Sequence, residues 1–191
     1  MRGAASRVAL CLGLLGGALW PGAAQAQNHA LESRLLHERE NLSRLREWNR
    51  AQRAWLPARV SPQARVLVVH LWATWCKACL PELGLYARMT REWRKDPRVA
   101  FLFVSEDATA EAVVRYWGAQ PPGQVPDVDP LYANGARLRG PVQDDSLPLT
   151  LLLDGRRVVR QVFAGALGVR NTELSAAIRR LLERETEDNH S

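Results

Sequence analysis

Cysteine is scarce in this sequence of 191 residues, and its distribution excludes several uses of the residue. Of three cysteines, Cys76 and Cys79 are two residues apart, whereas Cys11 stands alone near the N-terminus. A structural zinc site usually needs four nitrogen or sulfur ligands, and no second cysteine pair supplies them. Haem attachment requires a histidine after the second cysteine, but Leu80 occupies that position. So few cysteines also exclude a scaffold held together by several disulfides.

Long apolar runs, dense basic runs and tracts rich in methionine or histidine are also missing. The longest apolar run, residues 8–19, is shorter than the roughly 20 residues that span a bilayer. The formal net charge of +6 comes mainly from arginines scattered among acids, so we expect no nucleic-acid partner. Copper(I) suits soft thiolates, but no methionine-rich or histidine-rich tract accompanies the cysteine pair. A copper-binding or chaperone module that uses these cysteines therefore remains a weaker alternative.

The first 26 residues have the pattern of an export signal. Two arginines precede the apolar run, and small residues at positions 24 and 26 fit the cleavage positions. We expect a cleaved signal peptide over 1–26, a mature chain that starts at Gln27, and a periplasmic location. Cleavage would remove Cys11 and lower the formal charge from +6 to +4. An uncleaved N-terminus that anchors the chain in the membrane is the alternative.

The close cysteine pair stands between a predicted strand and a predicted helix. Residues 65–73 are apolar and β-branched, as in a buried strand, and residues 81–95 have helical spacing. Free N–H groups at the start of a helix favour the thiolate form and lower a thiol pKa from about 8.5 toward roughly 3.5–7.5. The positive charge of Lys77 should also lower the pKa of the neighbouring thiols. We predict that Cys76 is the exposed attacking thiol and Cys79 the buried resolving thiol. A permanent structural disulfide is the alternative, but so short a loop would stabilise the fold little.

The remaining pattern predicts an α/β fold. Helices are expected at residues 30–56, 109–117, 131–138 and 172–185, and strands at 98–105, 126–130, 149–153 and 157–163. We expect Pro81 to kink or restart the helix after the cysteines, and the Asp154-Gly155 turn to have positive φ at both residues. The order predicts a three-layer α/β/α sandwich over 63–184. A helical extension over 27–62 precedes it, and a polar tail, 185–191, follows it.

Three stretches carry a family resemblance: residues 70–79 (HLWATWCKAC), Glu82, and residues 147–150 (LPLT) before a strand. With the order of elements, they resemble the thioredoxin fold, and in particular the TlpA/ResA/DsbE-like branch of exported thioredoxins. The resemblance covers about residues 63–184. It implies a thiol:disulfide oxidoreductase that acts on protein disulfides and receives electrons from a membrane-bound donor of the DsbD/CcdA kind. No cofactor is expected beyond the redox-active cysteine pair.

The same resemblance implies a substrate-binding surface. Pro148 matches the cis-proline that faces the cysteine pair in this fold, where the backbone of Leu147 would pair with a substrate strand. Trp75, next to Cys76, is expected to contact substrate as well. An ordinary proline at the start of a strand is the alternative interpretation of Pro148.

Two further residues are assigned catalytic roles by resemblance alone. Glu82 matches an acid that assists proton movement at the cysteines in ResA-like proteins, although a surface glutamate on a helix is the alternative. His70 lies where thioredoxin has a buried acid. It could accept a proton from Cys79 or could be a core histidine with one hydrogen bond, and we favour the second.

The sequence departs from the family pattern at Ala78, where many relatives carry proline. The two residues between the cysteines influence the reduction potential, so the direction of electron transfer stays open. We predict a reductase of protein disulfides, with the cysteines of apocytochrome c among the substrates that the resemblance suggests. A disulfide oxidase or isomerase is the alternative.

Overall fold

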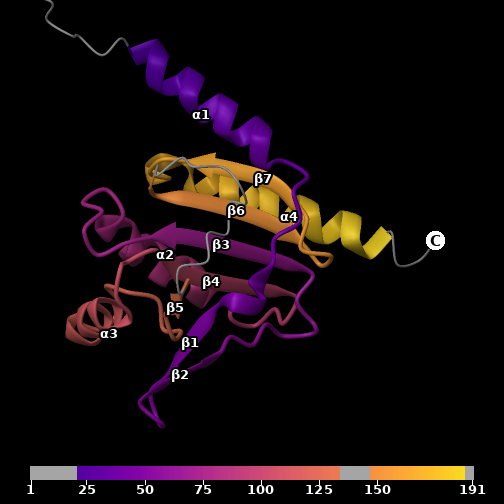
Figure 1. Ribbon diagram of the computed structural model, residues 1–191. Helices are drawn as coiled ribbons and strands as arrows, with labels where there is room; N and C mark the ends of the chain where they lie inside the picture. The colour runs from indigo at the N-terminus through magenta and orange to yellow at the C-terminus, as the bar shows by residue number, and fades with distance from the viewer. Residues whose placement is uncertain (1–20, 134–146, 188–191) are drawn as a thin grey trace, which may run out of the picture.

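The computed structural model describes residues 21–133 and 147–187, which form one mixed sheet with helices on both faces (Figure 1). The helices are α1 (Pro21–Leu35), α2 (Leu80–Trp93), α3 (Ala110–Ala119) and α4 (Asn171–Glu187), with 3-10 turns η1 (Leu42–Arg44) and η2 (Gly168–Arg170). The strands are β1 (Arg46–Asn49), β2 (Ala54–Pro57), β3 (Val66–Trp72), β4 (Val99–Ser105), β5 (Leu131–Tyr132), β6 (Leu149–Asp154) and β7 (Val159–Ala164).

The sheet has the strand order β2-β1-β5-β4-β3-β6-β7. The strand β3 lies between β4, to which it is parallel, and β6, to which it is antiparallel. Every residue of β3 is buried, as expected for a strand that is covered on both faces. Its carboxyl end leads into the cysteine pair, so the centre of the sheet positions the site.

The two faces of the sheet carry separate apolar clusters, which confirms the predicted α/β/α sandwich. Alternate residues of β3, such as Val68 and Trp72, pack with residues of α2, α3 and α4. The intervening residues, such as Val69, belong to the opposite cluster, where α1 contributes Leu31 and Leu35. Figure 1 shows α1 beside β7 and its N-terminal end directed away from the sheet.

The predicted helix over residues 30–56 is wrong beyond Leu35. Residues 46–57 instead form the antiparallel pair β1 and β2, which joins the main sheet through β5. The extension over 27–62 is therefore helical only in its first part. Trp48 and Trp55 mimic a helical stripe because they are seven residues apart, yet they face each other across the two strands with ring centroids 5.5 Å apart.

The prediction about Pro81 is also wrong. Pro81 lies in the first turn of α2 and neither kinks nor restarts it. Proline is tolerated there because its missing N–H would have no partner within the helix. The helix expected at 109–117 is α3, which continues past Gly118 to Ala119 after an N-cap in which the Thr109 side chain accepts from the Ala112 N–H. The expected strand 98–105 and helix 172–185 are confirmed as β4 and α4.

The β6–β7 hairpin is confirmed, but its turn differs from the prediction. Positive φ occurs at Arg157, not at Asp154 or Gly155. The Asp154 side chain accepts from the N–H groups of Arg156 and Val158, so a longer loop replaces the two-residue turn. The left-handed conformation of this longer loop falls on Arg157, so Gly155 does not need a positive φ.

The segment 119–147 is only partly described. The short strand expected at 126–130 is displaced to β5, so the helix expected at 131–138 is wrong for residues 131–132. The rest of that helix, most of the predicted signal peptide and the end of the polar tail lie outside the described residues. Within the part of the chain that is described, no helix is both long enough and apolar enough to cross a membrane.

Candidate active site

Cys76 and Cys79 form a disulfide in the turn between β3 and α2, with Cα atoms 5.3 Å apart. The turn is closed by the Cys79 N–H, which donates to the Cys76 carbonyl at 3.0 Å. Cys79 is the residue immediately before α2. Both cysteines are buried, Cys76 at 7% exposed and Cys79 at 0%, because the turn packs into the apolar cluster of α2, α3 and α4. The predicted exposure of Cys76 is therefore wrong, although Cys76 is the less buried residue of the pair.

The surface beside Cys76 is apolar and basic. Trp75 is 61% exposed, an unusual degree for a large aromatic side chain, and Lys77 is exposed on the other side of the cysteine. An exposed aromatic ring next to a reactive sulfur offers a contact for an apolar group of a substrate. These positions agree with the predicted role of Trp75 in substrate binding.

Pro148 lies at the same end of the sheet as the disulfide. It precedes β6, whose residue Leu149 pairs with Leu71 near the carboxyl end of β3. The bond between Leu147 and Pro148 is cis, as the resemblance implied. Leu147 is partly buried against both apolar clusters.

Glu82 is not a surface glutamate: it is 6% exposed, in the first turn of α2. Its Oε1 accepts from the backbone N–H groups of Leu167 and Gly168, and its buried Oε2 has no hydrogen-bond partner among the described residues. Burial raises the pKa of the Glu82 carboxyl, while the two N–H groups and Arg170 oppose the rise. Glu82 is thus a buried carboxyl three residues after Cys79, and its part in proton exchange stays a prediction.

His70 is fully buried beneath α2. Its Nδ1 lies 3.0 Å from Thr150 Oγ1, and its ring packs on the ring of Tyr86 with centroids 4.3 Å apart. Burial lowers the pKa of His70 to about 3. The imidazole is thus neutral at physiological pH and a poor proton acceptor, which supports the interpretation as a core histidine.

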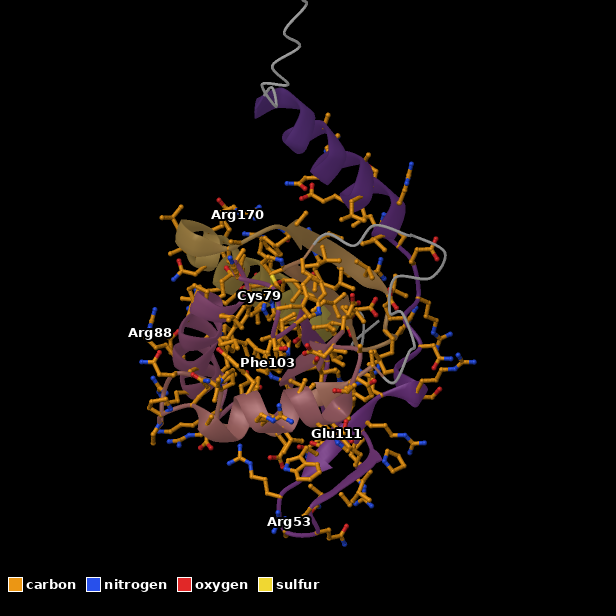
Figure 2. The ribbon with its side chains drawn as sticks, turned by 60° about the vertical axis from the view of Figure 1, so that its left-hand side comes forward. Arg53, Cys79, Arg88, Phe103, Glu111 and Arg170 are labelled. Atoms are coloured by element: carbon orange, nitrogen blue, oxygen red, sulfur yellow. A yellow bond between two sulfur atoms is a disulfide. The ribbon has the colours of Figure 1, made fainter. Side chains whose placement is uncertain are left out.

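Sequence reasoning missed the partners of these residues. The Thr150 hydroxyl lies 2.6 Å from the Tyr86 hydroxyl, so Thr150 connects Tyr86 and His70. Burial raises the pKa of the Tyr86 hydroxyl well above the usual value. Arg170 was also missed: it donates to the carbonyls of Ala164 and Ala166 and lies at the same end of the molecule as Cys79 (Figure 2).

A missed aspartate, Asp107, accepts hydrogen bonds from Thr74, two residues before Cys76. One signal was available: Asp107 follows the carboxyl end of β4, the parallel neighbour of β3, where sites of α/β sheets gather. Among the described residues, no group of three or more histidine, cysteine or acidic side chains is arranged to hold a metal ion.

Solved structures share this architecture. A protein described as a disulfide isomerase from Bacteroides thetaiotaomicron aligns with a TM-score of 0.60 at 15% identity, covering 82% of this chain and 95% of its own. A protein described as thiol:disulfide interchange protein DsbE from Chlorobium tepidum aligns with a TM-score of 0.59 at 13% identity, covering 76% and 98%. A thioredoxin-like protein from Porphyromonas gingivalis gives 0.53 at 17% identity, covering 74% and 92%. No protein-family model and no curated protein matches the chain.

At these identities the likeness establishes the fold alone, and it confirms the expected thioredoxin fold. The chain is a thioredoxin-fold protein with a Cys-x-x-Cys disulfide at the carboxyl end of its central strand.

Proposed function

We propose that the chain is an exported thiol:disulfide oxidoreductase of the TlpA/ResA/DsbE-like kind that reduces disulfides of other proteins. The observation that carries this proposal is the Cys76–Cys79 disulfide, in which the less buried cysteine is the one beside the exposed Trp75. The solved structures with this fold include proteins described as disulfide isomerase and thiol:disulfide interchange protein, which is consistent with the same chemistry.

The reaction starts from the reduced pair. The Cys76 thiolate attacks one sulfur of the substrate disulfide, which breaks that bond, forms a mixed disulfide and releases the other substrate sulfur as a thiolate. The Cys79 thiolate then attacks Cys76 Sγ, closes the Cys76–Cys79 disulfide and releases the second substrate sulfur. Two electrons pass to the substrate, and its two thiolates take up protons.

Glu82 is proposed to exchange the proton of Cys79, since it is buried three residues away and its pKa is raised. Leu147 and Pro148 are proposed to receive the substrate backbone, and Trp75 an apolar side chain. A membrane-bound donor of the DsbD/CcdA kind would restore the dithiol, because an oxidising compartment supplies no reductant. A disulfide between the cysteines of apocytochrome c is the substrate that the resemblance favours.

Insulin reduction in the presence of dithiothreitol tests the enzyme. The wild type should accelerate precipitation of the insulin B chain, Cys76→Ser should abolish the acceleration, and Cys79→Ser should accumulate a mixed disulfide with insulin. Equal rates in the wild type and both variants would overturn the proposal.

The direction of transfer is tested by the reduction potential of the cysteine pair in glutathione or dithiothreitol buffers. A value near about −270 mV, as in thioredoxin, supports a reductase. A value near about −120 mV identifies an oxidant and replaces the proposed direction with the oxidase alternative.

A further inference from the structure

The segment that carries Trp75 and Cys76 is attached to a neighbouring strand through one side chain. Residues 73–76 form a turn in which the Cys76 N–H donates to the Ala73 carbonyl at 3.1 Å. The Thr74 N–H donates instead to the carboxylate of Asp107, at 3.2 Å from Oδ1 and 3.0 Å from Oδ2. The Thr74 hydroxyl donates to Oδ1 at 2.6 Å. Both donors of Thr74 therefore end on the same carboxylate, 33 residues away in the sequence.

Asp107 is itself held in place by its own strand. The Ser105 hydroxyl donates to Asp107 Oδ2 at 2.6 Å, and the Asp107 N–H donates to Ser105 Oγ at 3.0 Å. Ser105 is 0% exposed and Asp107 is 6% exposed, so water competes little for these bonds. Ser105 also pairs with Trp72 in the parallel β3–β4 ladder, and the Glu106 N–H donates to the Trp72 carbonyl at 2.9 Å.

We propose that Asp107 is a positioning residue for the redox reaction, holding Cys76 at bonding distance from Cys79 through its hydrogen bonds with Thr74. These bonds are called the Thr74–Asp107 contact below. The contact joins the turn to the rigid centre of the sheet, whereas Cys79 is fixed separately at the start of α2. The Cys79 N–H bond to the Cys76 carbonyl also links the two cysteines directly. The contact adds a second restraint, which acts on Cys76 from the side of Thr74.

The expected consequence is a change in the effective concentration of the two thiols. A loosened turn lets the Cys76 sulfur move away from Cys79, which favours the dithiol over the disulfide. The same loosening slows attack on a substrate disulfide, because Cys76 then spends less time in the reactive orientation. Substrate contacts made by other residues are unaffected, so the loss should appear in kcat rather than in KM.

The matched variants are Thr74→Val, which removes the hydroxyl at nearly constant shape, and Thr74→Ser, which keeps it. Asp107→Asn tests the carboxylate directly, and Asp96→Asn is a control that breaks the Asp96–Arg98 ion pair after α2. The decisive measurement is the equilibrium constant of the full chain with reduced and oxidised glutathione. We expect Thr74→Val and Asp107→Asn to shift it about fivefold toward the dithiol, with Thr74→Ser and Asp96→Asn within twofold of wild type.

An equilibrium constant that is the same in Thr74→Val and Thr74→Ser overturns the inference, whether or not Asp107→Asn folds. Turnover supplies the second measurement: kcat for insulin should fall roughly tenfold in Thr74→Val, at unchanged KM, and recover in Thr74→Ser. The inference rests on the proposed function, but the two fail separately. If the wild type does not reduce insulin, the proposed function is lost, and the glutathione equilibrium still decides the role of Asp107.

Discussion

At the scale of single residues, burial determines what the acidic and basic groups near the disulfide can do. Glu82 and His70 come from neighbouring elements and are both buried, yet their pKa values move in opposite directions. Burial disfavours the charged form in each case, so the acid gains affinity for its proton and the base loses it. This difference supports Glu82, and not His70, as the group that exchanges protons with the cysteines.

Glu82 should make stability fall as the pH rises. Its pKa in the folded chain is raised above the unfolded value of 4.5, so the folded chain holds the proton more tightly. The stability that this provides is complete below pH 4.5 and is lost as the pH rises through the folded pKa. Glu82→Gln keeps an oxygen acceptor for the loop N–H groups and cannot ionise.

We therefore expect Glu82→Gln to gain stability relative to the wild type between pH 4.5 and neutral pH. Urea unfolding of the oxidised protein at several pH values measures this difference. Glu92→Gln, on an exposed position of the same helix, is the matched control. If the free energies of unfolding of Glu82→Gln and wild type change equally with pH, ionisation of the buried Glu82 does not destabilise the folded chain.

His70 should make stability fall as the pH decreases. The unfolded imidazole takes up a proton near pH 6.5, whereas the folded one does so only near its lowered pKa of about 3. Stability is therefore lost as the pH falls from 6.5 toward 3, with a slope of up to about 1.4 kcal/mol per pH unit for one proton. His70→Phe should show a shallower slope in urea unfolding over this range. His29→Phe, on an exposed position of α1, is the control and should keep the wild-type slope. The same slope in wild type, His70→Phe and His29→Phe would contradict the lowered pKa of His70.

At the scale of elements, the hairpin of β1 and β2 is the largest difference between expectation and structure. It extends the sheet at the edge away from β3 and the disulfide. Figure 2 shows Arg53, in the turn between β1 and β2, at the bottom of the molecule and well below Cys79. The hairpin is held by aromatic contacts of Trp55 with Trp48 and with Tyr132, whose ring centroids lie 5.5 Å and 5.7 Å away.

Removal of the central ring should cost stability without affecting redox chemistry. We expect Trp55→Ala to lower the free energy of unfolding by about 2 kcal/mol, since the ring is partly buried and contacts two other rings. The glutathione equilibrium of the cysteine pair should stay that of the wild type. Trp75→Ala removes an exposed ring and should leave stability nearly unchanged. Equal losses in the two variants, measured by urea unfolding, would show that the aromatic contacts of the hairpin contribute nothing.

At the scale of the whole molecule, the N-terminal helix completes the cover of one sheet face. Leu31 and Leu35 of α1 are buried in the cluster that contains Leu67, Val69 and Leu151. A chain that begins at Gln27 keeps both leucines, whereas one that begins at His37 exposes this part of the sheet. We expect the chain that begins at Gln27 to unfold at the same urea concentration as a chain that begins at Pro21. The free energy of unfolding of the chain that begins at His37 should be lower by roughly 4 kcal/mol. Equal stability of all three would mean that α1 is dispensable for the fold.

The proposed export predicts a defined N-terminus. Expressed with its first 26 residues in a bacterium with a periplasm, the chain should be recovered from that compartment with Gln27 as its first residue, as measured by intact mass. Replacing Ala26 by a bulky residue should block processing. Recovery of the full-length chain from the cytoplasm would overturn export while leaving the thiol chemistry untouched.

Local pattern predicted the parts of this protein that depend on near neighbours in the sequence. Short stretches of sequence were enough to predict three features. These are the redox pair, from the spacing of Cys76 and Cys79, the strand β3, from its apolar run, and the helix α4, from its apolar stripe. The resemblance added the fold and the cis bond before Pro148. The helix over 30–56 was predicted wrongly, because tryptophans seven residues apart fit both a helical stripe and two paired strands.

Contacts between distant segments were decided only by the tertiary structure. Glu82 is buried because the backbone near Leu167 folds over it, and the two positions are 85 residues apart. Asp107 reaches Thr74 because β3 and β4 are parallel neighbours, and His70 meets Thr150 because β6 pairs with β3. Burial, hydrogen-bond satisfaction and pKa depend on what surrounds a side chain in space, which composition and periodicity do not contain. The sequence alone therefore determined where the cysteine pair lies and between which kinds of element, and only the packed sheet decided which side chains are buried around it and which hydrogen bonds they make.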